Sequence, residues 1–233
     1  MGGSNLIVGI YYKLKSDIYL YDNSYLTGTT GTSNFTSGIF GNVIFKNTSY
    51  FDANFTYYIN GDVTFYDTSK PHSNTNIYAN NISWIGGCPP HTIVTKYYAQ
   101  TNTFNSIQSI AGHFVGGNVV VNGTSSLYYS AGNFFIGGNT TLILNDSCSL
   151  TSITFEDDYK SGASTLILNN DPSTNYTSGA TITTENPLNI IVNSRANGAG
   201  SLLDTMSIAS SSGTTITFNN DTYLDRSVVR FLS

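Results

Sequence analysis

The chain repeats a short phrase at a nearly constant interval. GNVIFKNTS begins at Gly41, and GDVTFYDTS begins 20 residues later at Gly61. A further pair, GNVVVNGTS at Gly117 and GNTTLILNDS at Gly138, is offset by 21 residues. A period of 20 to 24 residues is typical of solenoids, in which each repeat forms one coil that packs only on its neighbours.

Each repeat has the composition of a short β-strand. TLILN occurs at Thr141 and again at Thr165, and SITF at Ser152 has a weaker echo in TITF at Thr215. The runs are rich in Val, Ile, Thr, Phe and Tyr and are bounded by Gly, Asn, Asp or Ser, which favours strands separated by turns. A leucine-rich repeat has a similar period, but its LxxLxL pattern is missing. We therefore predict an all-β fold, a parallel β-helix that forms one domain over residues 1–233.

Alternation along these strands predicts which side chains face the interior. Side chains in a strand point alternately to its two faces. We expect Val43, Phe45, Val63 and Phe65 to stack in rows inside the solenoid, with coils about 4.8 Å apart.

Asparagine recurs where the apolar runs end. Asn tolerates the left-handed backbone of tight corners, and stacked Asn side chains can hydrogen-bond along a solenoid as a ladder. We expect this structural role for Asn47, Asn122, Asn145, Asn169 and Asn219.

One stretch departs from the repeat. It contains a Gly-Gly pair, a Pro-Pro pair, the only Trp and Cys88, and we expect a loop excursion around residues 84–112 that packs on the solenoid. The second cysteine, Cys148, is 60 residues further on, which is about three coils or ~14 Å along the axis. A disulfide needs Cα atoms within about 7 Å, so we expect two free thiols unless the loop folds back.

Composition excludes several classes of protein. Only 9 residues are Lys or Arg and the net charge is −5, so there is no basic patch for nucleic acid. The apolar runs are too short to span a membrane. A polar but uncharged surface suits an extracellular or cell-surface protein, and the opening MGGS, without a signal peptide, reads like the start of a fragment of a longer exported chain.

The ionisable residues do not form a catalytic or metal-binding motif. The run from Glu156 to Asp158 is the only acidic one, and a solvated turn explains it better than a calcium site. His72, His91 and His113 lack metal-ligand spacing. We therefore expect a protein that is not an enzyme and that uses no metal and no cofactor.

The remaining chemical signal is aromatic. There are 17 Tyr, several of them in doublets, and one member of a doublet in a strand points inward while the other points outward. With Ile18 and Leu20 inward, Tyr19 and Tyr21 share the outer face. Outward tyrosines on successive coils would form a strip on which sugar rings can stack, with Trp84 as an anchor. The candidate carbohydrate-binding residues are Tyr19, Tyr21, Tyr57, Tyr58, Trp84, Tyr97, Tyr98 and Tyr128.

The Gly-Asn-Val and Thr-Leu-Ile-Leu-Asn phrases, the Tyr-rich faces and the expected long loop resemble the C-terminal domain of tāpirins. These are cellulose-binding surface proteins of plant-degrading thermophilic bacteria. The resemblance implies a noncatalytic adhesin whose partner is insoluble plant polysaccharide, in particular cellulose.

Three other functions fit parts of the pattern. A polysaccharide lyase or glycosidase would need carboxylates with Lys or Arg on one coil face. A structural passenger or fibre segment would bury its aromatics and self-associate through the edges of its end coils. An ice-binding solenoid would need regular Thr-x-Thr rows, and only Thr181–Thr183 and Thr215–Thr217 fit that pattern.

Overall fold

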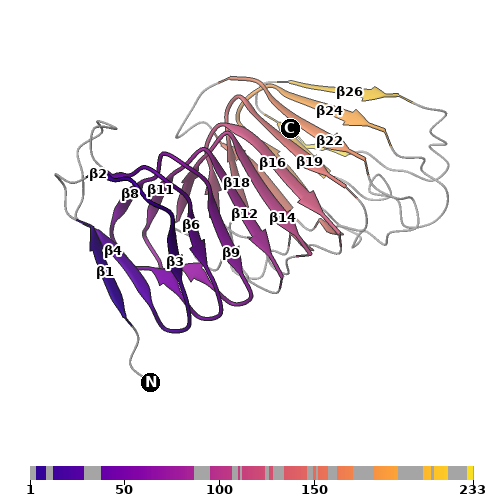
Figure 1. Cartoon of the computed structure of the whole chain (residues 1–233). Coiled ribbons are helices and arrows are strands. Elements are labelled where there is room, and N and C mark those ends of the chain that lie inside the picture. Colours follow the sequence, from indigo (N-terminus) through magenta and orange to yellow (C-terminus); the bar gives the residue numbers. More distant parts are fainter. Residues whose placement is uncertain are drawn as a thin grey trace.

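The chain folds into a parallel β-solenoid. In the computed structural model the strands stack coil upon coil from the N-terminal end to the C-terminal end (Figure 1), and no helix occurs among the described residues. The structure describes residues 4–8, 13–28, 38–86, 95–106, 110, 112–123, 126–127, 134–145, 149–150, 152–156, 162–169, 181–193, 207–210, 213–219 and 230–232. In these residues there is no helix long and apolar enough to cross a membrane.

Two long parallel sheets form the walls of the solenoid. The ten-strand sheet contains β3 (Ile18–Leu20), β6 (Val43–Phe45), β9 (Val63–Tyr66), β12 (Asn81–Ile85), β14 (Thr101–Asn105), β16 (Gly117–Asn122), β19 (Thr140–Leu144), β22 (Ser164–Leu168), β24 (Leu188–Val192) and β26 (Thr214–Phe218). The nine-strand sheet contains β8 (Thr56–Tyr58), β11 (Asn76–Tyr78), β13 (Lys96–Tyr98), β15 (Gly112–Phe114), β18 (Phe134–Gly137), β21 (Ser152–Glu156), β23 (Thr181–Thr184), β25 (Ser207–Ser210) and β27 (Arg230–Leu232).

Three smaller sheets complete the coils. A four-strand sheet contains β1 (Asn5–Val8), β4 (Tyr25–Gly28), β7 (Tyr50–Phe51) and β10 (Lys70–Pro71). The remaining strands pair as β2 (Lys13–Leu14) with β5 (Gly38–Ile39) and β17 (Ser126–Leu127) with β20 (Ser149–Leu150).

The repeated phrases are successive coils. Val43 pairs with Val63 in the 20-residue repeat, and Thr141 pairs with Thr165 in the 24-residue repeat. Val43, Phe45, Val63 and Phe65 are all fully buried, as predicted. The predicted parallel β-helix is therefore confirmed.

Two predicted alignments are wrong in register. Gly117 pairs with Thr140 rather than with Gly138, because this register places Val119 opposite Leu142 in the core. A shift of two residues keeps each side chain on its face, so the alternation of the sequence alone does not distinguish the two alignments. The SITF and TITF phrases do not pair at all, since they lie in β21 of the nine-strand sheet and β26 of the ten-strand sheet.

The predicted loop excursion around residues 84–112 is wrong for the part of it that is described. Trp84 lies in β12, and β13 and β14 continue the two long sheets. Asn81 pairs with Thr101 and Asn76 pairs with Lys96, both 20 residues apart, so the coil period is unbroken. Cys88 and Cys148 lie outside the described residues.

The interior of the N-terminal coils is an aromatic stack. The ring centroids are 5.0 Å apart for Phe45 and Phe65, 5.6 Å for Phe65 and Trp84, and 4.3 Å for Trp84 and Phe104. The interplanar angles of 11–18° show that these rings lie face to face along the axis. From β16 to β24 the same row is aliphatic, with Val121, Leu144, Leu168 and Val192, and it ends in Phe218 of β26.

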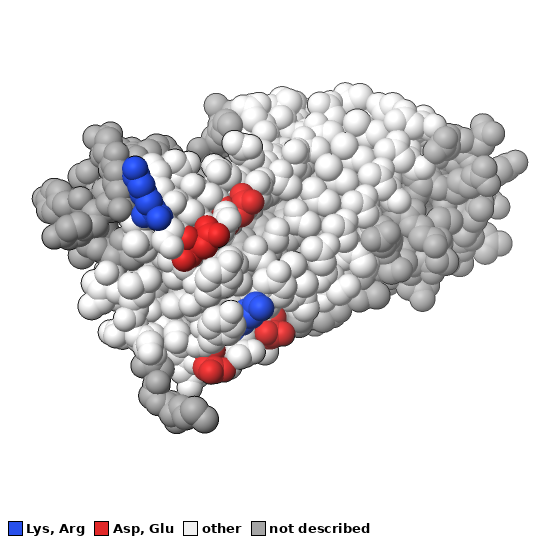
Figure 2. All heavy atoms as spheres, in the orientation of Figure 1, with Lys and Arg blue, Asp and Glu red and all other residues white. Residues whose placement is uncertain are grey.

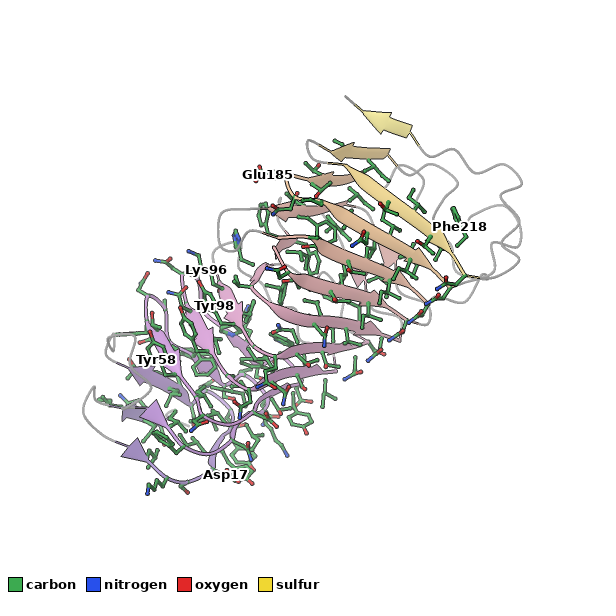
Figure 3. All side chains as sticks on the ribbon, turned by 90° about the horizontal axis from the view of Figure 1, so that it is seen from above. Asp17, Tyr58, Lys96, Tyr98, Glu185 and Phe218 are labelled. Carbon is green, nitrogen blue, oxygen red and sulfur yellow. The ribbon has the colours of Figure 1, made fainter. Side chains whose placement is uncertain are left out.

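Six asparagines stand one above another where strands of the ten-strand sheet end. They are Asn105, Asn122, Asn145, Asn169, Asn193 and Asn219. Each Nδ2 donates to Oδ1 of the asparagine one coil earlier, at 2.9, 2.8, 3.1, 2.7 and 2.9 Å in order along the row (Figure 3). The predicted ladder is thus confirmed, except that Asn47 donates to Asp22 instead. Among the asparagines predicted for this role, only Asn47 has a left-handed φ, at 59°.

The glycine that opens the repeated phrase is required by coil packing. A Cβ on Gly41 would collide with the carbonyl oxygen of Ser16 in the preceding coil, and a Cβ on Gly61 would collide with the carbonyl oxygen of Gly41. Backbone atoms cannot move aside as a flexible side chain can, so this corner accepts only glycine.

Gly61→Ala should therefore lower the free energy of unfolding by about 2 kcal/mol or more, because the coils must separate to admit the methyl group. Gly137→Ala is the matched control, since a Cβ there meets no atom closer than 3.5 Å. Urea unfolding of both variants tests this. Equal stability of Gly61→Ala and the wild type would contradict the close packing of the corners.

A polar side chain interrupts one otherwise apolar inward row of the ten-strand sheet. Asn102 is fully buried between Ile82 and Val119, and neither its Nδ2 nor its Oδ1 has a hydrogen-bond partner among the described residues. An unsatisfied buried amide costs free energy that an apolar group of similar shape does not.

Asn102→Leu should therefore raise the free energy of unfolding, by about 1–3 kcal/mol. Thermal and urea unfolding measure the change. A loss of stability would show instead that the amide makes a favourable interaction in the core.

Candidate functional site

The most exposed tyrosines of the described residues lie on the N-terminal part of the ten-strand sheet, and Phe218 at the end of β26 is the other exposed aromatic residue. Tyr19 and Tyr21 point outward and are 57% and 47% exposed. Lys46 places its Nζ between two rings, 5.8 Å from the centroid of Tyr21 and 5.3 Å from that of Tyr66. These distances fit cation–π contacts, which hold the lysine and the two rings in one row. We call Tyr19, Tyr21, Lys46 and Tyr66 the aromatic patch.

A polar row borders the aromatic patch where the strands begin. The backbone N of Asn42 donates to Oδ1 of Asp17 at 2.7 Å, and the backbone N of Asp62 donates to Oδ1 of Asn42 at 3.0 Å. In the next coil, Nδ2 of Asn81 donates to Oδ1 of Asp62 at 2.9 Å. The strand starts therefore carry an alternating Asp and Asn ladder.

A second polar row borders the patch where the strands end. Nδ2 of Asn47 donates to Oδ1 of Asp22 at 2.8 Å, and its backbone N donates to Oδ2 of Asp67 at 3.2 Å. A carboxylate can accept about four hydrogen bonds, so these contacts leave room for hydroxyl groups of a ligand. Aromatic rings thus lie between two rows of fixed acceptors.

The tyrosines of the nine-strand sheet form a different arrangement. Tyr58 and Tyr78 stack with centroids 4.8 Å apart, and Tyr78 and Tyr98 stack at 4.2 Å with an interplanar angle of 5°. Tyr58 and Tyr98 lie on a different side of the solenoid from Asp17 (Figure 3). Each ring face between neighbours is covered by the next ring, so a sugar meets mainly ring edges. This stack therefore stabilises the coils better than it could bind a sugar face.

A second aromatic stack was missed by the sequence analysis. Tyr25 and Tyr50 stack at 5.2 Å on the four-strand sheet, and the His72 ring lies 4.2 Å from Tyr50. The 25-residue spacing of the two tyrosines was the available signal, since it matches one coil. His113 similarly stacks on Phe135 at 4.5 Å.

Three of the predicted carbohydrate-binding residues are in the core. The expected exposure of Tyr57, Trp84 and Tyr97 is wrong, since they are 4%, 0% and 0% exposed. The alternation of side chains along each strand explains this. Trp84 lies two residues after buried Ile82 and therefore faces inward, and the two buried tyrosines are each followed by an outward tyrosine. The rule that one member of a doublet faces inward is confirmed for both described doublets. Tyr128 lies outside the described residues.

The Tyr57 hydroxyl is satisfied inside the solenoid. Its Oη donates to the backbone oxygen of Leu26 at 2.8 Å and also lies 3.2 Å from that of Asp52. Burial, reinforced by the Asp52 carboxylate, raises the pKa of Tyr57 well above its ordinary value. Burial also raises the pKa of Tyr50 and of Tyr58.

The ionisable groups of the described residues do not gather into a metal site. No group of three or more His, Cys, Asp or Glu lies close enough to hold an ion in this part of the chain. Asp157, Asp158 and His91 fall outside it. The acidic side chains bordering the aromatic patch are instead spread along two rows.

The C-terminal part of the ten-strand sheet presents three outward rows without charge, which we call the uncharged rows. The first contains Thr101, Asn118, Thr141, Thr165, Asn189 and Thr215. The second contains Thr103, Val120, Ile143, Ile167, Ile191 and Thr217. The third is the asparagine ladder. Figure 2 agrees with this contrast, since the charged side chains that it colours on this face lie in the N-terminal half of the described surface.

Comparison with protein-family models, with characterised proteins and with solved structures gives no match.

The buried Tyr57 hydroxyl predicts a loss of stability at alkaline pH. In the unfolded chain the tyrosine ionises near pH 10, whereas the folded protein holds it neutral to higher pH. Stability is therefore fully present below about pH 10 and falls as the pH rises further, by at most about 1.4 kcal/mol per pH unit for this group.

At pH 8, Tyr57→Phe should be less stable than the wild type, because it loses the hydrogen bond to Leu26. Above pH 10, the stability of Tyr57→Phe should fall less steeply with pH than that of the wild type. Urea unfolding between pH 8 and pH 11 measures both effects. Identical alkaline slopes would show that Tyr57 is not held neutral by the fold.

Proposed function

We propose that the protein is a noncatalytic binder of insoluble polysaccharide, with cellulose as its ligand, and that the aromatic patch is the binding site. The observation that carries this proposal is the exposure of Tyr19 and Tyr21 between two rows of Asp and Asn. Seven of the eight predicted residues belong to the described part of the chain, and of these seven only Tyr19 and Tyr21 are exposed.

The chemistry of the patch suits a sugar chain. Glucose rings in cellulose have apolar faces that stack on aromatic rings, and their equatorial hydroxyls point sideways. Tyr19 lies on β3 and Tyr21 directly follows this strand, about 7 Å further along the chain, so they can contact one extended sugar chain together. Asp17 and Asn42 on one side and Asp22 and Asn47 on the other supply acceptors and donors for the hydroxyls.

The site is preorganised, which favours binding. Each acceptor is held by a hydrogen bond to the adjacent coil, and Lys46 is held by the rings on either side. Little side-chain entropy remains to be lost when a ligand binds.

A glycosidase is the alternative for the same residues. Asp17 and Asp62 are two coils apart, about 10 Å, which is near the upper limit for a catalytic carboxylate pair. Both belong to one edge row rather than to opposite sides of a bound sugar, which favours binding over hydrolysis.

The resemblance to tāpirins supports the same function. Tāpirins are noncatalytic cellulose-binding proteins of the cell surface, and the solenoid and its Tyr-rich faces are the shared features. An extracellular or cell-surface location follows from this proposal.

Sedimentation with microcrystalline cellulose tests the proposal. We expect retention of the wild-type protein without release of soluble sugar, and at least about tenfold weaker retention of the Tyr19→Ala/Tyr21→Ala double variant, since each lost stacking contact costs about 1 kcal/mol. Xylan and chitin serve as comparison solids.

Tyr58→Ala is the matched control, because it removes a tyrosine from the stack on the nine-strand sheet. It should bind cellulose as the wild type does. Absence of retention on cellulose, or equal retention of the double variant, would contradict the proposal. Release of soluble sugar would favour the glycosidase.

A further inference from the structure

The uncharged rows form a regular array that the polysaccharide site does not use. They cover six coils from β14 to β26, and neighbouring positions are joined in register throughout. From this array we infer a second binding surface, and we propose that the outer face of β14–β26 binds ice.

The spacing of the array is set by the backbone. Successive coils repeat at about 4.8 Å, and outward side chains within a strand repeat at about 6.7 Å. Both distances are constant along the sheet because every strand is hydrogen-bonded in register to the next. Oxygen positions on the faces of hexagonal ice repeat at distances of a similar size, so the same contact can recur on each coil.

The side chains of the array are rigid. Thr, Val and Ile are branched at Cβ and have restricted χ1 angles. The third row is fixed by the hydrogen bonds of the asparagine ladder, which are 2.7–3.1 Å long. A surface that binds an ordered solid must itself be ordered before binding, because immobilising side chains costs affinity.

Thr-x-Thr pairs occur on this face only in β14 and β26, and the mixed Thr, Asn, Val and Ile positions between them also have chemistry that fits a water lattice. Thr141 and Thr165 each present a hydroxyl, which can occupy a position in a hydrogen-bonded lattice, beside a methyl group. The neighbouring Ile143 and Ile167 present only methyl groups, around which water is orientationally restricted. The absence of charge on these rows matters, because an ion would impose its own hydration shell and disturb the lattice.

Other ligands fit these rows less well. Nucleic acid requires cations, and the rows have none. A lipid surface requires a broad apolar face, whereas only the middle row is apolar. Stacking on sugar rings requires outward aromatic side chains, and the uncharged rows have none, since the partly exposed Phe218 of β26 continues the inward row of Val192. A second copy of the chain packed face to face would bury the hydroxyl and amide rows without donors matched to them.

The inference is independent of the polysaccharide proposal. It rests on β14–β26, whereas Tyr19 and Tyr66 of the aromatic patch lie on β3 and β9, and Tyr21 and Lys46 directly follow β3 and β6. The Tyr19→Ala/Tyr21→Ala double variant should therefore inhibit ice recrystallisation as the wild type does.

Ice-recrystallisation and thermal-hysteresis measurements on the whole chain test the inference. We expect the wild type to inhibit recrystallisation and to shape growing crystals. Thr165→Lys should abolish both effects, because it places a flexible charged side chain in the middle of the array. Where Thr165→Lys does not fold, Thr165→Leu, which removes the hydroxyl and breaks the regular surface without a charge, replaces it.

Thr154→Lys is the matched control, since Thr154 is an outward, half-buried threonine on the nine-strand sheet and belongs to no Thr-x-Thr pair. It should keep full activity on ice. Absence of any effect of the wild type on ice would overturn the inference, as would equal activity of the two lysine variants. Dimerisation of the wild type that Thr165→Lys abolishes, without an effect on ice, would show that the rows are instead an interface between copies.

Discussion

The structure depends on the hydrogen bonds that join each strand to its counterpart in the next coil. Because the strands are parallel and in register, equivalent positions lie directly above one another, and each position becomes a row along the axis. A row is stable only when similar side chains in adjacent coils pack or hydrogen-bond well with one another. Aromatic rings stack, asparagine amides donate to one another, and glycines admit the adjacent backbone. A slip of one residue would expose every core row at once.

The same outward position changes its chemistry along the axis, and this divides one face into two zones. Tyr66 and Ile85 share a row that continues as Asn105 and Asn122. The N-terminal zone therefore combines rings, a lysine and carboxylates, whereas the C-terminal zone has only hydroxyl, methyl and amide groups. Inside, the row that contains Phe45, Phe65, Trp84 and Phe104 changes from stacked rings to aliphatic side chains between β16 and β24. The two proposed ligands, a sugar chain and a water lattice, correspond to these two surfaces.

Repeats and alternation predicted most of the fold, because both are properties of single strands. They placed Phe45 and Phe65 inside and Tyr19 outside. The error at Trp84 arose from treating a rare residue as a likely anchor, although Ile82 two residues earlier already marked its face as inward. The Tyr58–Tyr78–Tyr98 stack follows the 20-residue coil and was predictable from spacing. Asn193 was missed because no repeated phrase surrounds it, and only the pairing of strands reveals its row.

The central functional claim is that the aromatic patch, and not the tyrosine stack, contacts polysaccharide. Hydroxyl-radical footprinting of the protein bound to cellulose tests this residue by residue. We predict protection of Tyr19, Tyr21 and Tyr66 on binding, with unchanged reactivity of Tyr58, Tyr78 and Tyr98. Protection of the tyrosine stack with continued reactivity of Tyr19 and Tyr21 would contradict the assignment and place the binding surface on the nine-strand sheet.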